Sequence, residues 1–359
     1  MSDYTPQPRP AAGGELCIVC DRHALPGEMV LRVRDGWTRH ADEAEADAND
    51  ATQEAAEAAR KAAEAEFAAR MVVDHAGVWD DMPDGIYHGD PVPDGSLSNS
   101  AAKWLLPPYS PAHYVARDQR KRPESVFDFG RAAHAVALGR GEPIEVIDAD
   151  SWRTKAAQEA RDAARKRGAT PLLTADWLTV QAMAEALIDH PIAGELLTAS
   201  AGTPELSAFA PDPTTGVWLR GRFDLHVGGY LYDYKTAASA DPGTFARRAV
   251  DYGYHRQAAW YLDLARAVGL DADQFGFIVQ EKEPPYAVAC IRLSDEHLTL
   301  GRRDMRTAID TYAACLDSGL WPGYGDDWQT VELPGYLRAR LYDHLDPATE
   351  AELLALLSH

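Results

Sequence analysis

The segment from Gly221 to Thr236 reads GRFDLHVGGYLYDYKT and contains residue types that could bind a cation and act on a substrate. Two runs of strand-forming residues separated by Gly228-Gly229 predict a β-hairpin with a two-residue turn. Counting outward from this turn sets Asp224 directly opposite Asp233, with Lys235 on the same face of the second strand. The hairpin therefore predicts two carboxylates and an amine in one place.

The two faces of the predicted hairpin differ in character. The charged face carries Arg222 opposite Lys235, next to the two aspartates. The other face is apolar and is expected to belong to the core. It sets Phe223, Leu225 and Val227 opposite Tyr234, Tyr232 and Tyr230.

Two aspartates opposite each other need a partner that removes their repulsion. Opposed Cβ atoms on paired strands lie about 4.5 to 5.5 Å apart, and like charges there destabilise a sheet. A divalent cation removes the conflict, since Mg²⁺ and Mn²⁺ prefer oxygen ligands, and a nearby lysine can orient a water molecule or stabilise developing negative charge. This chemistry suits hydrolysis of a phosphodiester. The alternative is a solvated strand face whose charges are balanced by Arg222 and Lys235.

The composition is that of a soluble globular protein. The chain has 359 residues, of which 46% are hydrophobic, enough for one large domain with an appendage or for two small domains. The formal charge of -21 does not indicate a nucleic-acid binder, although a basic groove on an acidic body is compatible with it. The sequence has no run of about 18 apolar residues and no signal-peptide pattern, so we expect a cytoplasmic protein without membrane contact.

Changes in composition divide the chain into four segments. Residues 1–14 are rich in Pro and Gly and are expected to be disordered, and residues 15–40 resemble a small knuckle with a short hairpin. Residues 41–72 are rich in Ala and Glu and predict a solvated helical spacer. Residues 73–359 form the remaining domain, whose patterns predict an α/β order. They predict helices over 127–139, 151–167, 174–191 and 242–267, and strands over 217–236 and 275–293.

Several motifs occur in an order found in one known family. They are FGRAAH (129–134), matching a Gly-x-x-x-His helix; GRFD (221–224); DYK (233–235), matching Asp-x-Lys; and YGYHRQAAWYLD (252–263), matching a Gln-x-x-x-Tyr helix. The segments 96–114 and 277–288 also resemble the family's opening segment and late strands. The ordered set resembles the PD-(D/E)XK nuclease superfamily, specifically its exonuclease VIII and lambda-exonuclease-like branch found in phages and prophages. The resemblance covers residues 84 to 300, with Arg-Phe-Asp in place of the eponymous Pro-Asp.

The resemblance implies a PD-(D/E)XK core, a central mixed β-sheet flanked by helices, and a role for each matching residue. Asp224 and Asp233 would bind Mg²⁺ or Mn²⁺, and Lys235 would position or activate the attacking water. His134 would help to hold metal or phosphate from its helix. The alternative for His134 is a partly buried histidine on an Ala-rich helix.

The Gln-x-x-x-Tyr helix and one further acid would complete the site. Gln257 and Tyr261 lie one helical turn apart and, with Tyr254, can line one face beside the site. In the family this helix contacts the catalytic lysine or the DNA backbone, whereas the alternative makes both tyrosines part of a packing stripe. Glu205 resembles an acidic residue that related exonucleases place near the metal, and the alternative is an ordinary surface glutamate.

The N-terminal segment contains a second group of metal-ligating residue types. Cys17, Cys20 and His40 resemble part of a zinc knuckle, but a structural zinc site needs four ligands. Asp42, Glu43 or His23 would have to supply the fourth. The alternative is a pair of free cysteines. An iron-sulfur cluster is not expected, because Cys290 and Cys315 lack the close spacing of a cluster loop.

By resemblance, the chain would be a metal-dependent DNA exonuclease that resects the ends of linear duplexes from the 5′ strand without ATP. Members of this branch commonly form rings and work beside a single-strand annealing protein in recombination. Two other functions remain open. One is a structure-specific, restriction or helicase-linked endonuclease of the same superfamily, and this chain has no ATP-binding P-loop of its own. The other is a non-catalytic module that binds DNA or recruits a partner.

Overall fold

A computed structural model of the chain describes residues 71–120, 127–198 and 202–342, together with 9–10, 29–30 and the single positions 349, 352 and 355. The chain divides into one compact unit from Met1 to Trp321 and a second from Pro322 to His359. The first unit contains every predicted catalytic residue, and it is described first.

Little is described before residue 71. Strand β1 (Arg9–Pro10) pairs with β2 (Met29–Val30) in an antiparallel two-stranded sheet. The candidate zinc ligands Cys17, Cys20 and His40 lie outside the described residues, as do their alternative partners and the predicted helical spacer up to residue 70. The zinc site therefore stays a prediction.

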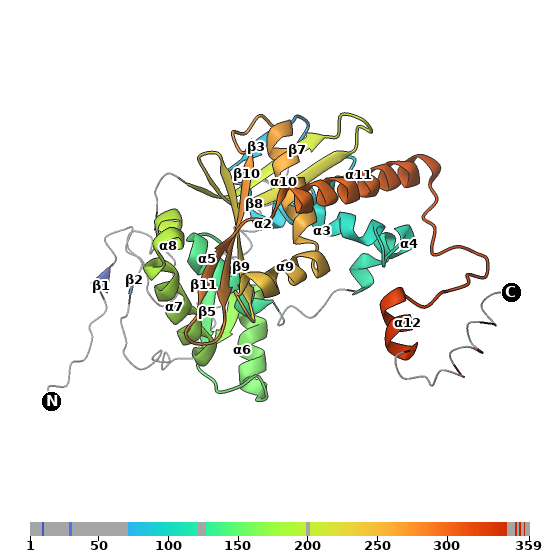
Figure 1. The fold of residues 1–359 in the computed structure, drawn as a ribbon. Coiled ribbons are helices and arrows are strands. Elements are labelled where there is room, and N and C mark those ends of the chain that lie inside the picture. Colours follow the sequence, from blue (N-terminus) through green and yellow to red (C-terminus); the bar gives the residue numbers. More distant parts are fainter. Residues whose placement is uncertain are drawn as a thin grey trace. The chain divides into compact units, whose positions relative to one another are not determined.

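The centre of the first unit is a seven-stranded mixed sheet, visible in Figure 1 between two groups of helices. Its path runs β11-β10-β9-β8-β7-β3, and β4 pairs with β8 off this path. The strands are β3 (Gly77–Trp79), β4 (Leu97–Ser98), β7 (Thr203–Pro211), β8 (Trp218–Val227), β9 (Tyr230–Ala237), β10 (Gln274–Glu281) and β11 (Val288–Ile291). The β9–β10 and β4–β8 pairs are parallel and the remaining pairs are antiparallel. The predicted central mixed sheet flanked by helices is confirmed.

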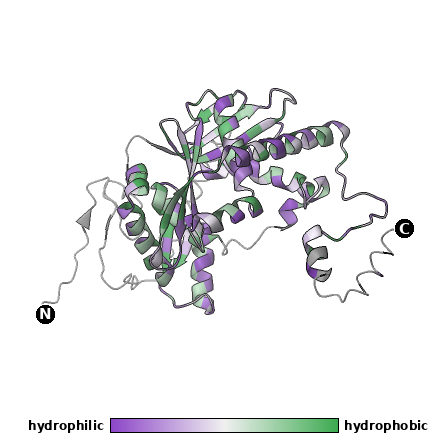
Figure 2. Ribbon diagram, in the orientation of Figure 1, coloured by the Kyte–Doolittle hydropathy of each residue, from purple (hydrophilic) through white to green (hydrophobic). Residues whose placement is uncertain are grey.

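Helices pack on both faces of this sheet. The α-helices described in the first unit are α2 (Asp84–Gly89), α3 (Asn99–Ala102), α4 (Pro111–Val115), α5 (Asp128–Leu138), α6 (Lys155–Lys166), α7 (Thr174–Asp189), α8 (Pro191–Thr198), α9 (Pro242–Asp251), α10 (Tyr254–Ala267) and α11 (Asp295–Ser318), of which α6 lies away from this sheet. The larger hydrophobic cluster joins the sheet to α3, α4, α9, α10 and α11. A second cluster joins it to α5, α7 and α8. In Figure 2 the largely hydrophilic α6 stands out from these amphipathic helices.

A small sheet that the sequence analysis did not predict lies beside α5 and α7. Strand β5 (Ile144–Ile147) runs parallel to β6 (Thr170–Leu173), and α6 connects them. Leu172 of β6 belongs to the same buried cluster as Ala132 and Ala133 of α5. The small sheet thus supports the helix that carries His134.

The single helix predicted over residues 242–267 is wrong, because two helices occupy this range. Helix α9 ends at Asp251 and α10 begins at Tyr254. Between them Gly253 has φ 76°, a left-handed conformation that glycine adopts without the steric cost other residues meet. The chain turns at this residue, and the packing stripe expected of one long helix is divided between two.

The second unit, from Pro322 onward, contains helix α12 (Gly335–Tyr342). Several large apolar side chains in its described part are exposed, among them Tyr324, Trp328, Val331 and Tyr336. No helix in the described parts of the chain is long and apolar enough to cross a membrane.

Gly301 allows α11 to pack closely against α10. A Cβ atom at this position would lie 2.2 Å from the backbone oxygen of His255. We therefore expect Gly301→Ala to lower the free energy of unfolding by about 1 to 3 kcal/mol, because the two helices must separate. Urea unfolding followed by tryptophan fluorescence measures the change.

Gly85→Ala is the matched control for Gly301→Ala. Gly85 is exposed in α2, and a Cβ there would meet nothing within 4 Å. Alanine in a helix is favoured over glycine by roughly 0.5 to 1 kcal/mol, so the control should be neutral or stabilising. Equal destabilisation by both substitutions would contradict the close helix packing.

Candidate metal and catalytic site

The candidate site lies where strands β8 and β9 separate. They pair only through Val227 with Tyr230, His226 with Leu231 and Leu225 with Tyr232. Further back, β8 pairs with β4 at Leu219 and Arg220 instead. The stretch between these two pairings, Gly221 to Asp224, is therefore the point at which β8 leaves one neighbour for another.

The register predicted at the turn is confirmed, but the pairing does not continue to the charged residues. Asp224 is not paired with Asp233, nor Arg222 with Lys235. Instead, Asp224 Oδ2 accepts a hydrogen bond from the backbone N–H of Tyr234 at 2.9 Å. A hydrogen bond from backbone to side chain thus replaces a backbone hydrogen bond between β8 and β9, and it joins the two strands where they diverge.

Helix α10 explains why the strands separate here. Trp260 Nε1 donates to the backbone oxygen of Arg220 at 3.0 Å. Gly221 lies directly beneath the same helix, since a Cβ on it would be 2.9 Å from Leu264 Cδ2 and 3.1 Å from Tyr261 Cε1. The helix packs against bare backbone, which only glycine permits at this distance.

The predicted separation into an apolar face and a charged face is wrong. Phe223 packs against α10, but Tyr234, predicted on the same face, belongs to the cluster of α5 and α7. Likewise Asp224 contacts His134 of α5, whereas Asp233 contacts Gln257 of α10. Asp233 is only 1% exposed. The charged side chains are buried because helices cover both faces of the sheet, which a two-strand pattern does not reveal.

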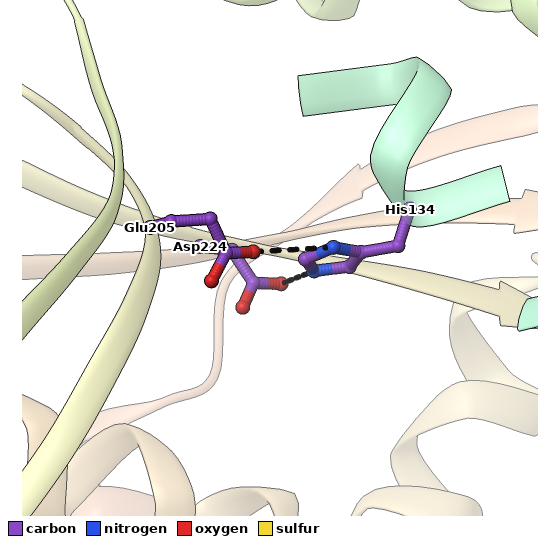
Figure 3. Close-up of side chains that lie close together, drawn as sticks. All are labelled: His134, Glu205 and Asp224. Carbon is purple, nitrogen blue, oxygen red and sulfur yellow. Dashed lines mark ion pairs between the residues drawn. The ribbon is translucent and has the colours of Figure 1, made fainter. Parts of the chain in front are cut away.

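Three side chains form the first half of the site, as Figure 3 shows. His134 Nε2 lies 2.9 Å from Asp224 Oδ2, and His134 Nδ1 lies 3.3 Å from Glu205 Oε1. One ligand atom from each of these residues lies within 4.8 Å of the others. Helix α5, strand β7 and strand β8 therefore bring two carboxylate oxygens and one imidazole nitrogen together.

Glu205 reaches this group through an irregular point in β7. Its neighbours Pro204 and Leu206 pair with Leu225 and Phe223, so Glu205 lies level with Asp224, yet these two residues are not paired. Glu205 has φ 54°, a left-handed conformation uncommon outside glycine. Only the family resemblance indicated Glu205, and no strand was predicted over residues 203–211.

In this half of the site, a proton on His134 supplies the positive charge that a bound cation could supply instead. Burial by itself would lower the pKa of His134, but the Asp224 carboxylate and, more weakly, Glu205 raise it to about 9. Burial raises the pKa of Glu205 to about 7. Burial also opposes the charge on Asp224, but the His134 imidazolium outweighs it and lowers the pKa of Asp224. A protonated His134 thus holds two carboxyl groups that would otherwise repel each other.

The second half of the site surrounds Asp233. Its carboxylate forms an ion pair with Lys235 Nζ and accepts a hydrogen bond from Gln257 Nε2 at 2.6 Å. Lys235 Nζ also lies 5.3 Å from the centre of the Tyr254 ring. The predicted Asp-x-Lys and Gln-x-x-x-Tyr motifs are thereby in direct contact.

The charges of this half are coupled to those of the first. Burial, together with the negative charge of Asp224, raises the pKa of Asp233 to about 6. Burial opposes the charge on Lys235, but the carboxylates of Asp233 and Asp224 outweigh it and raise the pKa of this lysine. Lys235 is therefore a cation at neutral pH.

Tyr261 packs in the core and also hydrogen-bonds to Gln257 of the site. Its ring packs against Phe223 and Phe275, with centroids 5.1 and 6.1 Å away. Burial raises the pKa of Tyr261 well above 10, so its phenol is neutral. Tyr261 thus packs as the alternative predicts and also contacts Gln257, so its catalytic role stays a prediction. Tyr254 likewise packs on Phe245 and contacts Lys235.

Arg222 lies beside the first half of the site, so the prediction that it lies opposite Lys235 is wrong. It forms an ion pair with Asp84, donates to the backbone oxygen of Met82 at 2.8 Å and lies 3.8 Å from Glu205. Its guanidinium also stacks over Tyr87 at 4.3 Å. Arg222 thus adds a positive charge beside Glu205 rather than beside Lys235.

A cleft of about 1000 Å³ leads to His134 and Glu205. It runs between α5, β6, α7 and the β10–β11 connection, and its lining mixes both signs of charge with aromatic rings. Lining residues absent from the predicted site include Arg131, Arg140, Phe129, Thr236, Lys282 and Tyr286. Of these, Arg131 could have been found, because it lies three residues before His134 and hence on the same helical face.

The donor set of the first half fits a divalent cation. Carboxylate oxygens suit Mg²⁺ and Mn²⁺, and an imidazole nitrogen also suits Mn²⁺. The repulsion between Glu205 and Asp224, now balanced by a proton on His134, would be balanced by the cation instead. Asp233 is oriented toward Lys235 and Gln257, so its predicted role as a metal ligand stays a prediction.

Residues 98–334 match a family model described as a PDDEXK-like domain of unknown function (DUF3799). A comparison with curated proteins finds no match. Among solved structures, a candidate exonuclease from Eubacterium rectale is similar at 13% identity with a TM-score of 0.45, covering 62% of this chain and 82% of that one. A phage-related exonuclease from Haemophilus somnus 129PT is similar at 11% identity with a TM-score of 0.25, covering 62% and 95%. Likeness at this level carries no information about activity.

Replacing Asp224 should weaken metal binding. We expect Asp224→Asn to weaken Mn²⁺ binding at least about tenfold in calorimetric titrations, because it removes a charged ligand from a set of three. Asp263→Asn is the control, since Asp263 also lies on the first unit but pairs with Arg302 and Arg266. Equal Mn²⁺ affinity of the Asp224 variant and the wild type would contradict the site.

The raised pKa of His134 can be measured in the metal-free protein. We expect its imidazole resonances in ¹⁵N-histidine NMR to titrate near pH 9, and at a lower pH in Asp224→Asn. A raised pKa stabilises the folded state fully below the ordinary histidine pKa of about 6.5, and this stabilisation is lost as the pH rises through 9. His134→Gln assigns the signal, and a midpoint at or below 6.5 in the wild type would refute the ion pairs.

Proposed function

We propose that this chain, which belongs to the PDDEXK-like DUF3799 family, hydrolyses phosphodiester bonds in DNA with the help of a divalent cation. The predicted resemblance to the PD-(D/E)XK superfamily is confirmed by this membership. One observation carries the proposal: His134, Glu205 and Asp224 form a cation-sized group directly beside the Asp233–Lys235 pair, at the end of a cleft.

The first half of the site would hold the cation, Mg²⁺ or Mn²⁺. Glu205 and Asp224 offer oxygens and His134 offers a nitrogen once it has lost its proton. When bound, the cation supplies Lewis acidity at the scissile phosphate and lowers the pKa of a bound water. Asp233, the second predicted ligand, would have to turn partly away from Lys235 to bind the same cation.

Lys235 would act as a fixed positive charge. Since its raised pKa keeps it protonated, it is suited to stabilising negative charge on the phosphate and to orienting a water molecule, and not to accepting a proton. The ion pair with Asp233 and the ring of Tyr254 limit where its amine can lie.

Gln257 would be a positioning residue. Its amide donates to Asp233 Oδ1, so one carboxylate oxygen is held by Gln257 while the other pairs with Lys235. Removal of the amide would leave a buried carboxylate oxygen without this partner, at a cost of about 1 to 3 kcal/mol. This role explains the Gln-x-x-x-Tyr motif through contact with the acid rather than with DNA.

We further propose the finer activity that the resemblance implies. The protein would be an ATP-independent 5′ to 3′ exonuclease that acts in the cytoplasm on the ends of linear duplex DNA. It would serve recombination beside a single-strand annealing protein, as a ring-shaped oligomer. The acidic overall charge is compatible with this function if the positive side chains lie along the DNA path.

Digestion of linear and covalently closed circular duplex DNA tests the activity and its dependence on ends. With Mg²⁺ or Mn²⁺, we expect the wild type to degrade only the linear form. Lys235→Ala should reduce the rate about 100-fold or more, since one preorganised charge contributes this much in comparable sites. Lys155→Ala, which removes an exposed lysine on α6, should leave the rate unchanged.

The remaining outcomes separate the alternatives. Equal attack on circular DNA would identify an endonuclease instead of an exonuclease. Absence of metal-dependent cleavage by folded wild-type protein, with DNA binding retained, would favour the non-catalytic module. A Lys235 variant as active as the wild type would place the chemistry elsewhere.

A further inference from the structure

The junction between α9 and α10 presents an aromatic ring to solvent. Tyr252, the residue that follows α9, is 59% exposed. Its backbone N–H donates to the backbone oxygen of Arg248 at 2.9 Å, and the next residue is the left-handed Gly253. The backbone that carries this ring is therefore fixed by the helix end.

The ring itself is also held in place. Arg248 Nη1 donates to Tyr252 Oη at 2.8 Å, and the guanidinium lies 5.7 Å from the centre of the ring. An exposed tyrosine is normally free to change rotamer, and ordering it on binding a ligand has an entropic cost. Here the arginine already restricts it, so the ring is preorganised.

Tyr252 is connected to the candidate catalytic group through one further ring. The centroids of Tyr252 and Tyr254 lie 5.7 Å apart, and Lys235 Nζ lies 5.3 Å from the centre of the Tyr254 ring. An exposed aromatic surface thus begins two ring contacts away from the lysine. This surface lies on the α9–α10 side, and none of these tyrosines lines the cleft beside α5.

The surroundings of Tyr252 on α9 include two arginines. Arg247 and Arg248 are both exposed, and the acids of this segment are Asp251 at the end of α9 and the N-cap Asp241, which accepts a hydrogen bond from Thr244. Two adjacent exposed arginines thus lie beside an exposed ring. Aromatic stacking combined with arginine is the chemistry by which proteins hold unpaired nucleotides.

We propose that Tyr252 and Arg248 form a binding site for one unpaired nucleotide of the substrate strand, next to the catalytic group. The base stacks on the Tyr252 ring and the guanidinium of Arg248 contacts the adjoining phosphate. The proposal deepens the proposed function and rests on it for the identity of the substrate. It implies that the strand is unpaired at this position, since a base inside a duplex cannot stack on a side chain.

Binding of a fluorescein-labelled oligothymidylate, measured by anisotropy in EDTA, tests the proposal without cleavage. We expect Tyr252→Ala to weaken binding about 5- to 150-fold, the range for loss of one stacked base. Tyr252→Phe keeps the ring and should stay within about threefold of the wild type. Val250→Ala, which removes an equally exposed side chain without a ring two residues earlier, should bind as the wild type does.

Abasic positions in the oligonucleotide distinguish stacking from a general loss of binding. Removing one base at a time from the probe should weaken wild-type binding at one position, and this penalty should disappear in Tyr252→Ala. Identical penalties in wild type and Tyr252→Ala at every position would overturn the proposal. So would a Tyr252→Ala variant with wild-type affinity.

Together with the digestion assay, the binding measurement separates this proposal from the nuclease assignment. If binding depends on Tyr252 but the wild type cleaves no DNA, the nucleotide site is supported and the nuclease is rejected. If the wild type cleaves DNA but binding does not depend on Tyr252, the nuclease is supported and the nucleotide site is rejected. Arg248→Gln provides a further readout, because loss of a phosphate contact should reduce the salt dependence of binding by about one unit of log-log slope.

Discussion

The site depends on the point at which strand β8 exchanges β9 for β4. A continuous hairpin would close its backbone hydrogen bonds and leave no room for catalytic side chains between the strands. Here α10 packs on Gly221, the ladder ends at Leu225 and Tyr232, and the Asp224 carboxylate takes the hydrogen bond that the backbone no longer offers. One side chain therefore both secures the divergence and serves the candidate cation.

Burial and close pairing set the protonation of the charged groups in this region. Six ionisable or amide side chains meet in a mostly buried group at the end of the cleft, and each has a partner within the group. His134 holds two carboxyl groups, and Lys235 with Gln257 holds the third. Because electrostatic interactions strengthen as the local dielectric constant falls, carboxylates buried in this way would attract a cation strongly.

Local patterns predicted the turn register and an α/β order, and the family resemblance predicted the mixed sheet and the closeness of the Gln-x-x-x-Tyr helix to the Asp-x-Lys motif. The local patterns failed where tertiary packing decides the outcome. The burial of Asp233 follows from helices on both faces of the sheet, and the position of Arg222 follows from α2. Glu205 breaks the alternation of its strand, and Gly253 divides a helix that periodicity alone makes continuous. The catalytic roles of the individual residues stay predictions.

Glu205 also bears on how this fold could change over time. A non-glycine residue in the left-handed region costs of order 1 kcal/mol or more, so glycine or asparagine at this position would relax the strand. Selection for thermal robustness alone would remove the glutamate. A carboxylate on such a backbone lowers stability, so variants selected only for stability would be expected to lose this candidate ligand early.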